Sequence, residues 1–389
     1  MRSVLTALLI ATALLLPSAT LAQDEAPVLE PDPAVADQLP VDTFYRGRVI
    51  EVIEDGTRSL DGYAQPYQVL RIRLEHGPLA NQDVTVEHGE RFSIQETQKV
   101  RRGERVLIGE TTRVDGSTFL YVADRMRTRP LIALASLFLV LIVAVAGLSG
   151  LRSLLGLAFT VLVIGWFLLP RIVGGADPLI TSFTATVAIA IVSLYLAHGL
   201  RRRTTVAVLA TLATLGIATG LAVLFASVAH LSGAGSEDAF SLQIGQLAGL
   251  DLRGLLLGSI LIGALGVLDD VTTAQAATIE ELKRANPALT PRELYRRGLS
   301  VGREHVTSLV NTLALAYVGA ALPLFLVAAV NQTYPAWVFV NSEFFAEEVL
   351  RTLVGSIALI LAVPLTSVLA AYAFRDGAEA ERKHAGHHH

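Results

Sequence analysis

The sequence predicts a polytopic α-helical membrane protein of about seven transmembrane helices, with a small extracytoplasmic all-β domain of OB type near the N-terminus. Of the 389 residues, 52% are hydrophobic and only 17% are charged, whereas soluble globular proteins carry about 25% charged residues. The mean hydropathy is +0.52. Between Pro130 and Leu200 the only formally charged residues are Arg152, Arg171 and Asp177. A soluble core cannot accommodate so long an uncharged segment.

Residues 1–22 are typical of a secretory signal peptide. Arg2 precedes an apolar run from Val4 to Leu16, and the segment ends at Ala22. This run is shorter than the ~20 residues that cross a bilayer, which favours a cleaved signal over an uncleaved first helix. In both cases the following segment is expected outside the cytoplasm. Residues 23–40 are rich in Pro, Asp, Glu and Ala and are interpreted as a flexible linker.

From residue 41 to 127 the hydrophobic pattern alternates with a period of two, which indicates β-strands. The expected strands are 44–52, 67–74, 84–86, 105–108 and 119–122, and the first is expected to end at the turn Asp55-Gly56. About five short strands suit a small barrel or sandwich of OB type. No aromatic stacking surface for nucleotides or sugars is evident. A structural cap or a partner-docking module is therefore the favoured interpretation.

Seven apolar segments follow, and each can hold a helix of roughly 20 residues. They are expected at 130–149, 152–171, 178–198, 204–230, 253–280, 306–330 and 349–374. If the β domain is extracytoplasmic, the loops around 201–203 and 283–303 lie on the cytoplasmic side of the membrane. Both loops are rich in arginine, as the positive-inside rule requires. The same orientation places the tail, residues 375–389, in the cytoplasm. Arg171 and the cluster at 125–129 run against this positive-inside pattern.

The composition also excludes several classes of function. A net charge of −4 and a pI near 6.2 argue against nucleic acid as a partner. The absence of cysteine excludes thiolate nucleophiles and Cys-ligated zinc. Motifs of the P-loop, G-x-S-x-G and H-E-x-x-H types are missing, so neither an enzyme, a metal site nor a cofactor is predicted. The expected partners are the lipid bilayer and a small solute or ion.

The fifth segment contains the adjacent acids Asp269 and Asp270. Acidic groups at membrane depth are costly and normally face a bundle interior or a water-filled path. Gly266, Asp270, Thr273 and Ala277 share one helical face, which favours Asp270 as the embedded acid. Because adjacent helical residues point about 100° apart, the two acids cannot act as a facing pair. The alternative is that the helix ends earlier and both carboxylates lie in the cytoplasmic interface.

The sixth segment contributes Asn311 and Thr312, expected near the depth of Asp270 on an antiparallel neighbour joined by a loop of about 23 residues. A polar site formed with Thr273 and Gln275 is one interpretation, and an ordinary interhelical hydrogen bond is the other. Weaker candidates complete the set, namely Asp269, Arg303, His305 and Tyr317. Pro323 and Pro364 indicate helix kinks more readily than the broken helices found at transporter sites.

The residues of the fifth and sixth segments resemble the YibE/F-like family of bacterial membrane proteins. The similar stretches are 251–256, 263–272, 302–305, 310–313 and 316–323, within a resemblance that covers about 130–374. In that family a glycine-rich helix ends in Asp-Val, which corresponds to Asp270, while Asp269 occupies a more variable place. Glu304 stands where the family pattern has Asp. The resemblance implies a multi-span protein of the bacterial cell (inner) membrane with an extracytoplasmic N-terminal domain, and it implies no particular substrate.

Three functional hypotheses result from these observations. The leading one is a secondary transporter or channel-like permease in which Asp270 couples to a proton or cation and Thr273, Gln275, Asn311 and Thr312 line the site. The second is a non-transporting membrane module that assembles or regulates a protein partner through its β domain. The third is an intramembrane enzyme that uses Asp270 and His305, which the expected difference in their depths disfavours.

Overall fold

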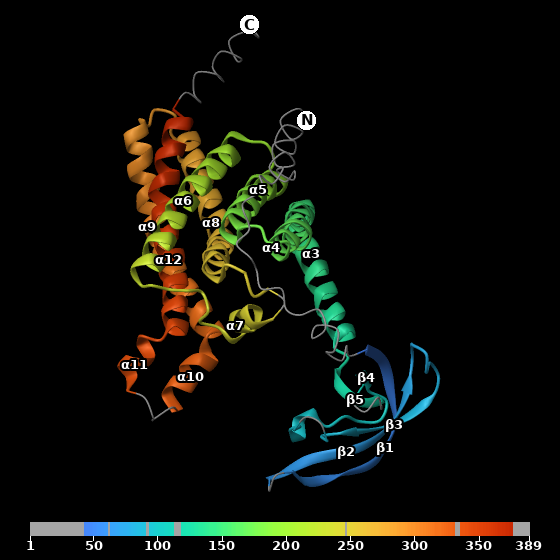
Figure 1. Ribbon diagram of the computed structural model, residues 1–389. Helices are drawn as coiled ribbons and strands as arrows, with labels where there is room; N and C mark the ends of the chain where they lie inside the picture. The colour runs from blue at the N-terminus through green and yellow to red at the C-terminus, as the bar shows by residue number, and fades with distance from the viewer. Residues whose placement is uncertain are drawn as a thin grey trace. The chain divides into compact units, whose positions relative to one another are not determined.

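The computed structural model describes residues 43–60, 63–90, 93–112, 118–245, 247–330 and 335–375. The expected signal peptide, linker and most of the C-terminal tail lie outside these residues. The described chain forms two compact units, one up to Leu141 and one from Ile142 onward. The first unit contains a β-sheet, and the second contains a helical bundle (Figure 1).

The first unit is a five-stranded antiparallel sheet in the order β3-β2-β1-β4-β5. Its strands are β1 (Thr43–Leu60), β2 (Tyr63–Leu74), β3 (Asp83–His88), β4 (Arg105–Thr112) and β5 (Thr118–Arg125). All five expected strands are present. The expected turn at Asp55-Gly56 is wrong, because β1 continues through these residues and pairs with β2 as far as Leu60. Alternation alone cannot show that a hairpin extends past a turn-like dipeptide.

The sheet curves around a small apolar core. Leu70, Ile72 and Leu74 of β2 face Val106 and Ile108 of β4, and all five are fully buried. Two register shifts between β1 and β2 bend the strands, as β-bulges do. The edge strands β3 and β5 also contact each other. The sheet therefore curls back on itself, and the antiparallel sheet that the sequence predicts is confirmed.

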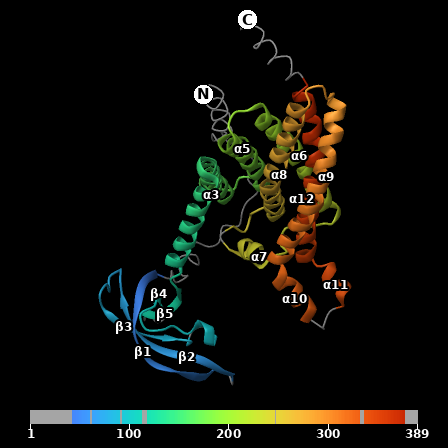
Figure 2. The same ribbon diagram turned by 180° about the vertical axis from the view of Figure 1, so that it is seen from behind.

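The second unit is built from long helices that lie side by side in both views (Figures 1 and 2). The helices are α3 (Thr128–Val163), whose first part up to Leu141 belongs to the first unit, a π-helical turn (Ile164–Leu168), α4 (Leu169–Val173), α5 (Pro178–His198), α6 (Arg202–Val228), α7 (Glu237–Ile244), α8 (Leu252–Ala285), α9 (Pro291–Ala320), α10 (Leu322–Val330), α11 (Ala336–Val340) and α12 (Glu343–Ala373). The sequence predicts neither α7 nor α11.

Five described helices are long and apolar enough to cross a membrane, or six if α9 and α10 form one span bent by 62°. Seven were expected. The difference lies at residues 128–173, where two expected segments form one continuous helical run of 46 residues. This run is bent at Gly147, whose φ of 56° and ψ of −136° are not helical. The expected boundary between residues 149 and 152 lies close to this bend, but no loop separates the two segments.

Helix α8 is the central helix of the bundle and packs against α5, α6, α9 and α12. Small residues allow close approach between these helices. On α6, Ala218, Ala222 and Ala226 are fully buried against α8 and α12. Across the α6–α8 contact, the hydroxyls of Thr211 and Thr272 are 2.8 Å apart and hydrogen-bonded. Side-chain packing and this buried polar contact fix the rotation of α8 about its own axis.

The segment between the fifth and sixth expected spans is mostly helical, which corrects the expected loop of about 23 residues. Helix α8 continues to Ala285, and α9 begins at Pro291. Thr290 and Glu293 form a capping box in which each side chain accepts a hydrogen bond from the other residue's backbone N–H. Such a box satisfies the free N–H groups at a helix start. The basic residues of this region therefore lie on helices.

Candidate functional site

One buried polar group of the bundle is the carboxyl group of Asp269 on α8. Asp269 is half-buried, and its Oδ1 atom is fully buried without a hydrogen-bond partner among the described residues. One helical turn later the hydroxyl of Thr273 is buried and likewise unpartnered. Residues four apart lie on the same helical face. Two adjacent oxygen groups are thus held inside the bundle without satisfied hydrogen bonds.

The face that carries Asp269 is the face directed at α5. Leu265, one turn before Asp269, packs in a cluster with Ala185 and Ile189 of α5. Near the start of α8, a Cβ atom on Gly258 would clash with Ser182 of α5. Side chains at i and i+4 are stacked on one face of a helix, so Asp269 continues this line of contact.

The structure reverses the expected burial of the two acids. Asp270 is exposed on the surface of the bundle, and Gly266, expected to admit a neighbouring helix, has open space where a Cβ atom would lie. The reason is that successive side chains of a helix are rotated by about 100° about the helix axis. Asp269 therefore points into the helix packing while Asp270 points away from it.

Gln275 is buried, but its contacts are structural. The side-chain amide nitrogen donates hydrogen bonds of 2.9 Å to the carbonyl of Gly298 and 2.8 Å to the hydroxyl of Ser367. These bonds join α8 to α9 and α12. A Cβ atom on Gly302 would lie 2.8 Å from the Gln275 Oε1 atom. The expected residue is inside the bundle, yet it ties three helices together rather than lining an open site with Asp269.

The remaining expected residues lie on α9, and most are exposed. Asn311, Thr312, Arg303 and His305 all face outward. Helices α8 and α9 are neighbours, as expected, but α9 packs mainly on α12. The expected association of Asn311 and Thr312 with an acid on α8 is therefore not present. Their depth could be counted from the sequence, but the side of α9 that faces the bundle could not.

Tyr317 is the member of the expected set that reaches a cavity. Its half-buried ring lies between α8 and α12. The Tyr317 hydroxyl is 3.2 Å from the point where a Cβ atom on Gly263 would lie, and 3.7 Å from the corresponding point on Gly355. Beside it, at the bend between α9 and α10, is a cavity of about 360 Å³. Pro323, Phe344, Glu348 and Arg351 contribute to its lining.

Sequence reasoning missed the charged pair in this cavity. The Arg351 Nε atom lies 3.6 Å from the Glu348 Oε2 atom, and both side chains are partly buried. This distance is too long for a hydrogen bond, so the buried Nε–H group lacks an acceptor. A signal was present, because Arg351 is the only charged residue of the expected span 349–374. Charged groups within membrane spans mark functional sites by default.

The comparison with known families agrees with the membrane bundle. The family model of the YibE/F-like proteins matches residues 134–376. The chain belongs to the YibE/F-like family. This confirms the resemblance of the fifth and sixth expected segments. No curated protein and no solved structure matches the chain significantly. The YibE/F-like match contains Asp269, Tyr317 and Arg351 and excludes the β-sheet unit.

In this YibE/F-like bundle, two glutamates of α12 hold the chain that follows α6. Glu343 accepts hydrogen bonds from the backbone N–H groups of Ser232 and Gly233 and from the Ser232 hydroxyl. Glu347 is 6% exposed and accepts a 3.0 Å hydrogen bond from the N–H of Gly235. A Cβ atom on Gly235 would lie within 2.9 Å of the Glu347 carboxylate. The first turns of α12 are thus fixed to the segment 232–235.

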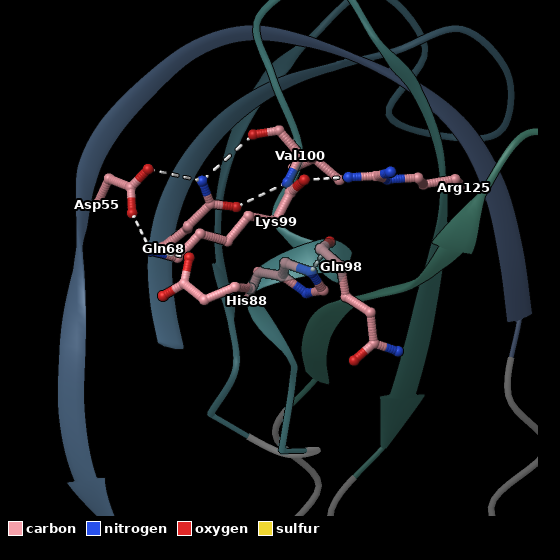
Figure 3. A network of polar contacts seen from close by, with 8 residues as sticks. Asp55, Gln68, His88, Gln98, Lys99, Val100 and Arg125 are labelled. Atoms are coloured by element: carbon pink, nitrogen blue, oxygen red, sulfur yellow. Dashed lines mark hydrogen bonds and ion pairs between the residues drawn. The ribbon is translucent and has the colours of Figure 1, made fainter. Parts of the chain in front are cut away.

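The β-sheet unit, outside the YibE/F-like match, contains its own polar network (Figure 3). Gln68 is 2% exposed and exchanges two hydrogen bonds with the backbone of Val100, while its amide also donates to Asp55. The hydrogen bond from Lys99 is the largest cause of a lowered pKa at Asp55. The segment 99–100 is therefore held against the sheet.

His88 lies at the other side of this network, beside a cavity of about 180 Å³ that is also lined by Asp124 and Arg125. The His88 Nε2 atom is 3.2 Å from the carbonyl oxygen of Gln98. Burial lowers the pKa of His88, and the hydrogen bond to Gln98 opposes this shift. In the described part of the chain, no group of three or more His, Asp or Glu side chains is arranged to hold a metal ion.

Proposed function

We propose that this protein is a secondary transporter or channel-like permease in which Asp269 is the ion-coupling acid. The single observation that carries the proposal is the buried, unpartnered Oδ1 atom of Asp269, with the unpartnered Thr273 hydroxyl one turn away. Polar groups that are buried without partners are costly, and acids at membrane depth commonly belong to proton or ion pathways. Asp269 takes the role that the sequence assigned to Asp270.

The chemistry at Asp269 is the exchange of a proton or a cation. A carboxylate in apolar surroundings is stabilised when it binds either one, and the Thr273 hydroxyl supplies a second oxygen at the same face. Release of the ion on one side of the membrane then requires a change in the packing of α8 against α5. The surface acid Asp270 is assigned no coupling role, and no catalytic residue is proposed.

The proposal includes the expected topology. The 46-residue run 128–173 would be about 70 Å long as a straight helix, well beyond a hydrocarbon core of about 30 Å. We therefore propose that the bend at Gly147 separates two spans, which makes seven. The signal sequence and the basic residues near 201–203 support an extracytoplasmic β domain and a cytoplasmic C-terminus in a bacterial inner membrane.

The test compares Asp269→Asn with Asp270→Asn, a matched pair on adjacent positions. Each purified protein is reconstituted into vesicles, and solid-supported membrane electrophysiology records currents after jumps of amino acids, carboxylic acids, sugars and inorganic ions across a pH gradient. We expect a solute-dependent current from the wild type and from Asp270→Asn, and none from Asp269→Asn. A wild type that is silent toward the whole panel, or an unchanged Asp269→Asn current, contradicts the proposal.

The second candidate is a non-transporting module that docks a protein partner through the β domain. The cavity beside His88 supports it, because charged residues such as Asp124 and Arg125 offer polar contacts to a partner. Deletion of residues 41–127 separates the two functions. If vesicle currents and activity in cells both survive the deletion, docking is not the main role. If activity in cells is lost while the vesicle currents stay intact, docking is supported.

A further inference from the structure

We propose that the cavity at the bend between α9 and α10 binds a small zwitterionic solute that has an ammonium group, a carboxylate and an apolar side group, as an aliphatic amino acid has. This inference rests on the proposed transport function and names its solute class. The cavity measures about 360 Å³, within the range of about 300–1,000 Å³ usual for small-molecule sites.

The bend itself favours a binding site. Helices α9 and α10 meet at 62°, and Pro323 is the second residue of α10. Proline lacks a backbone N–H group and cannot continue the hydrogen-bond ladder. Interrupted helices at membrane depth are tolerated where the irregular backbone is buried in protein or lines a cavity, and transporters use them to bind solutes. Here the interruption coincides with a cavity that contains both signs of charge.

The charges of the cavity favour a ligand with no net charge. Arg351 supplies one guanidinium and Glu348 one carboxylate, so the lining is neutral overall. A single anion or cation would leave one unbalanced charge in a partly buried site, which is costly. A zwitterion balances both groups, because its carboxylate pairs with Arg351 and its ammonium group with Glu348.

The polar groups of the cavity have unused bonding capacity. The contact between Arg351 and Glu348 is 3.6 Å long, and 32% of the Arg351 side chain is exposed, so part of the guanidinium side chain is accessible to a ligand. Guanidinium groups recognise carboxylates through paired hydrogen bonds. The apolar part of the lining includes Phe344, Leu324 and Pro323. The cavity therefore offers a charged end and an apolar end, which match the two ends of an aliphatic amino acid.

The experiment measures equilibrium binding to the purified full chain, without a membrane gradient. Tritiated leucine is the probe, and the competitors are 4-methylpentanoate, which lacks the ammonium group, and 3-methylbutylamine, which lacks the carboxylate. We expect saturable leucine binding and competition roughly tenfold weaker or more for both analogues, since each leaves one charge of the partly buried pair without a ligand partner. No saturable binding of leucine, or equal competition by either analogue, overturns the zwitterion class.

Variants assign the binding to the cavity. Arg351→Gln should weaken leucine binding roughly tenfold or more. Arg253→Gln is the matched control, because Arg253 also has a buried, unpartnered Nε atom but does not line the cavity. Glu348→Gln should shift the ligand preference from leucine toward 4-methylpentanoate. Misfolding cannot produce such a gain in binding. Equal losses in the two arginine variants, or an unchanged preference in Glu348→Gln, overturn the assignment.

The same assay separates this inference from the proposed function. Asp270→Asn should bind leucine with unchanged affinity, because Asp270 is exposed and does not line the cavity. Leucine binding without any coupled current would overturn the transport function alone. A coupled current for other solutes without leucine binding would overturn the zwitterion site alone.

Discussion

The side-chain amide of Gln275 on α8 donates a 2.9 Å hydrogen bond to the backbone carbonyl of Gly298 on α9. The same nitrogen donates to Ser367 of α12, so one buried amide joins three helices. Hydrogen bonds of this kind hold membrane helices in register because lipid offers no alternative partner. The consequences of this and other contacts can be measured.

Replacement of Gln275 by leucine should destabilise the bundle. The change leaves the Gly298 carbonyl and the Ser367 hydroxyl without this donor, and we expect a loss of about 1–3 kcal/mol in the free energy of unfolding. Thermal unfolding in detergent measures the effect. Gln243→Leu on the exposed surface of α7 is the control and should leave the unfolding temperature nearly unchanged. Equal unfolding temperatures for both variants would show that the amide contributes no net stability.

Two glycines should respond in opposite ways to alanine. A Cβ atom on Gly298 would lie 2.7 Å from the Cγ1 atom of Ile279, whereas one on Gly266 meets nothing within 4 Å. Gly298→Ala should cost about 1–3 kcal/mol through overpacking. Gly266→Ala should be neutral or stabilising, because alanine favours helix. Unfolding in detergent distinguishes the two, and a marked loss in Gly266→Ala would indicate a helix partner at that face.

Asp269→Asn should raise the stability of the protein at pH 8 by about 1 kcal/mol, since it removes a partly buried carboxylate whose Oδ1 atom has no hydrogen-bond partner among the described residues. Asp270→Asn, on the exposed side of α8, should change stability little. The measurement is the unfolding temperature in detergent. A clear destabilisation by Asp269→Asn would mean that the carboxylate has a stabilising partner and is not a free coupling group.

His88 should make the β domain less stable at acid pH. Burial lowers its folded pKa below the ordinary value of about 6.5, so the unfolded chain binds the proton more readily. Its contribution to stability is full above pH 6.5 and is lost as the pH falls through the folded pKa. Hydrogen exchange of peptides 83–88 and 93–100 should therefore accelerate between pH 7 and 5 after correction for intrinsic rates. His88→Gln should be less sensitive, and identical pH profiles would exclude this role.

Hydropathy located the long helices well. The span expected at 178–198 coincides with α5, and the one expected at 204–230 lies within two residues of α6 at each end. The reason is that the length of an apolar run reflects the thickness of the bilayer. The helical first half of α9 was missed because its many charges resemble a loop. The capping box at Thr290 and Glu293 was the available signal.

The rotation of each helix about its axis could not be predicted in the same way. In a membrane the contrast between a polar and an apolar helix face is lost, since lipid-facing and core-facing side chains are both apolar. Asp270 was preferred to Asp269 because it shares a face with Gly266, and the structure turns that face outward. The contact partners that set this rotation lie on α5, α6 and α12. Such partners are far away in the sequence and leave no local pattern.

The hydrogen bonds from segment 232–235 to Glu343 and Glu347 have a consequence for movement at this end of the bundle. They anchor the first turns of α12, the helix that carries Glu348 and Arg351. In α10, by contrast, only Leu324 is buried. We therefore expect any opening of the cavity to occur as a hinge rotation of α10 at Ala321, with α12 as the stationary wall.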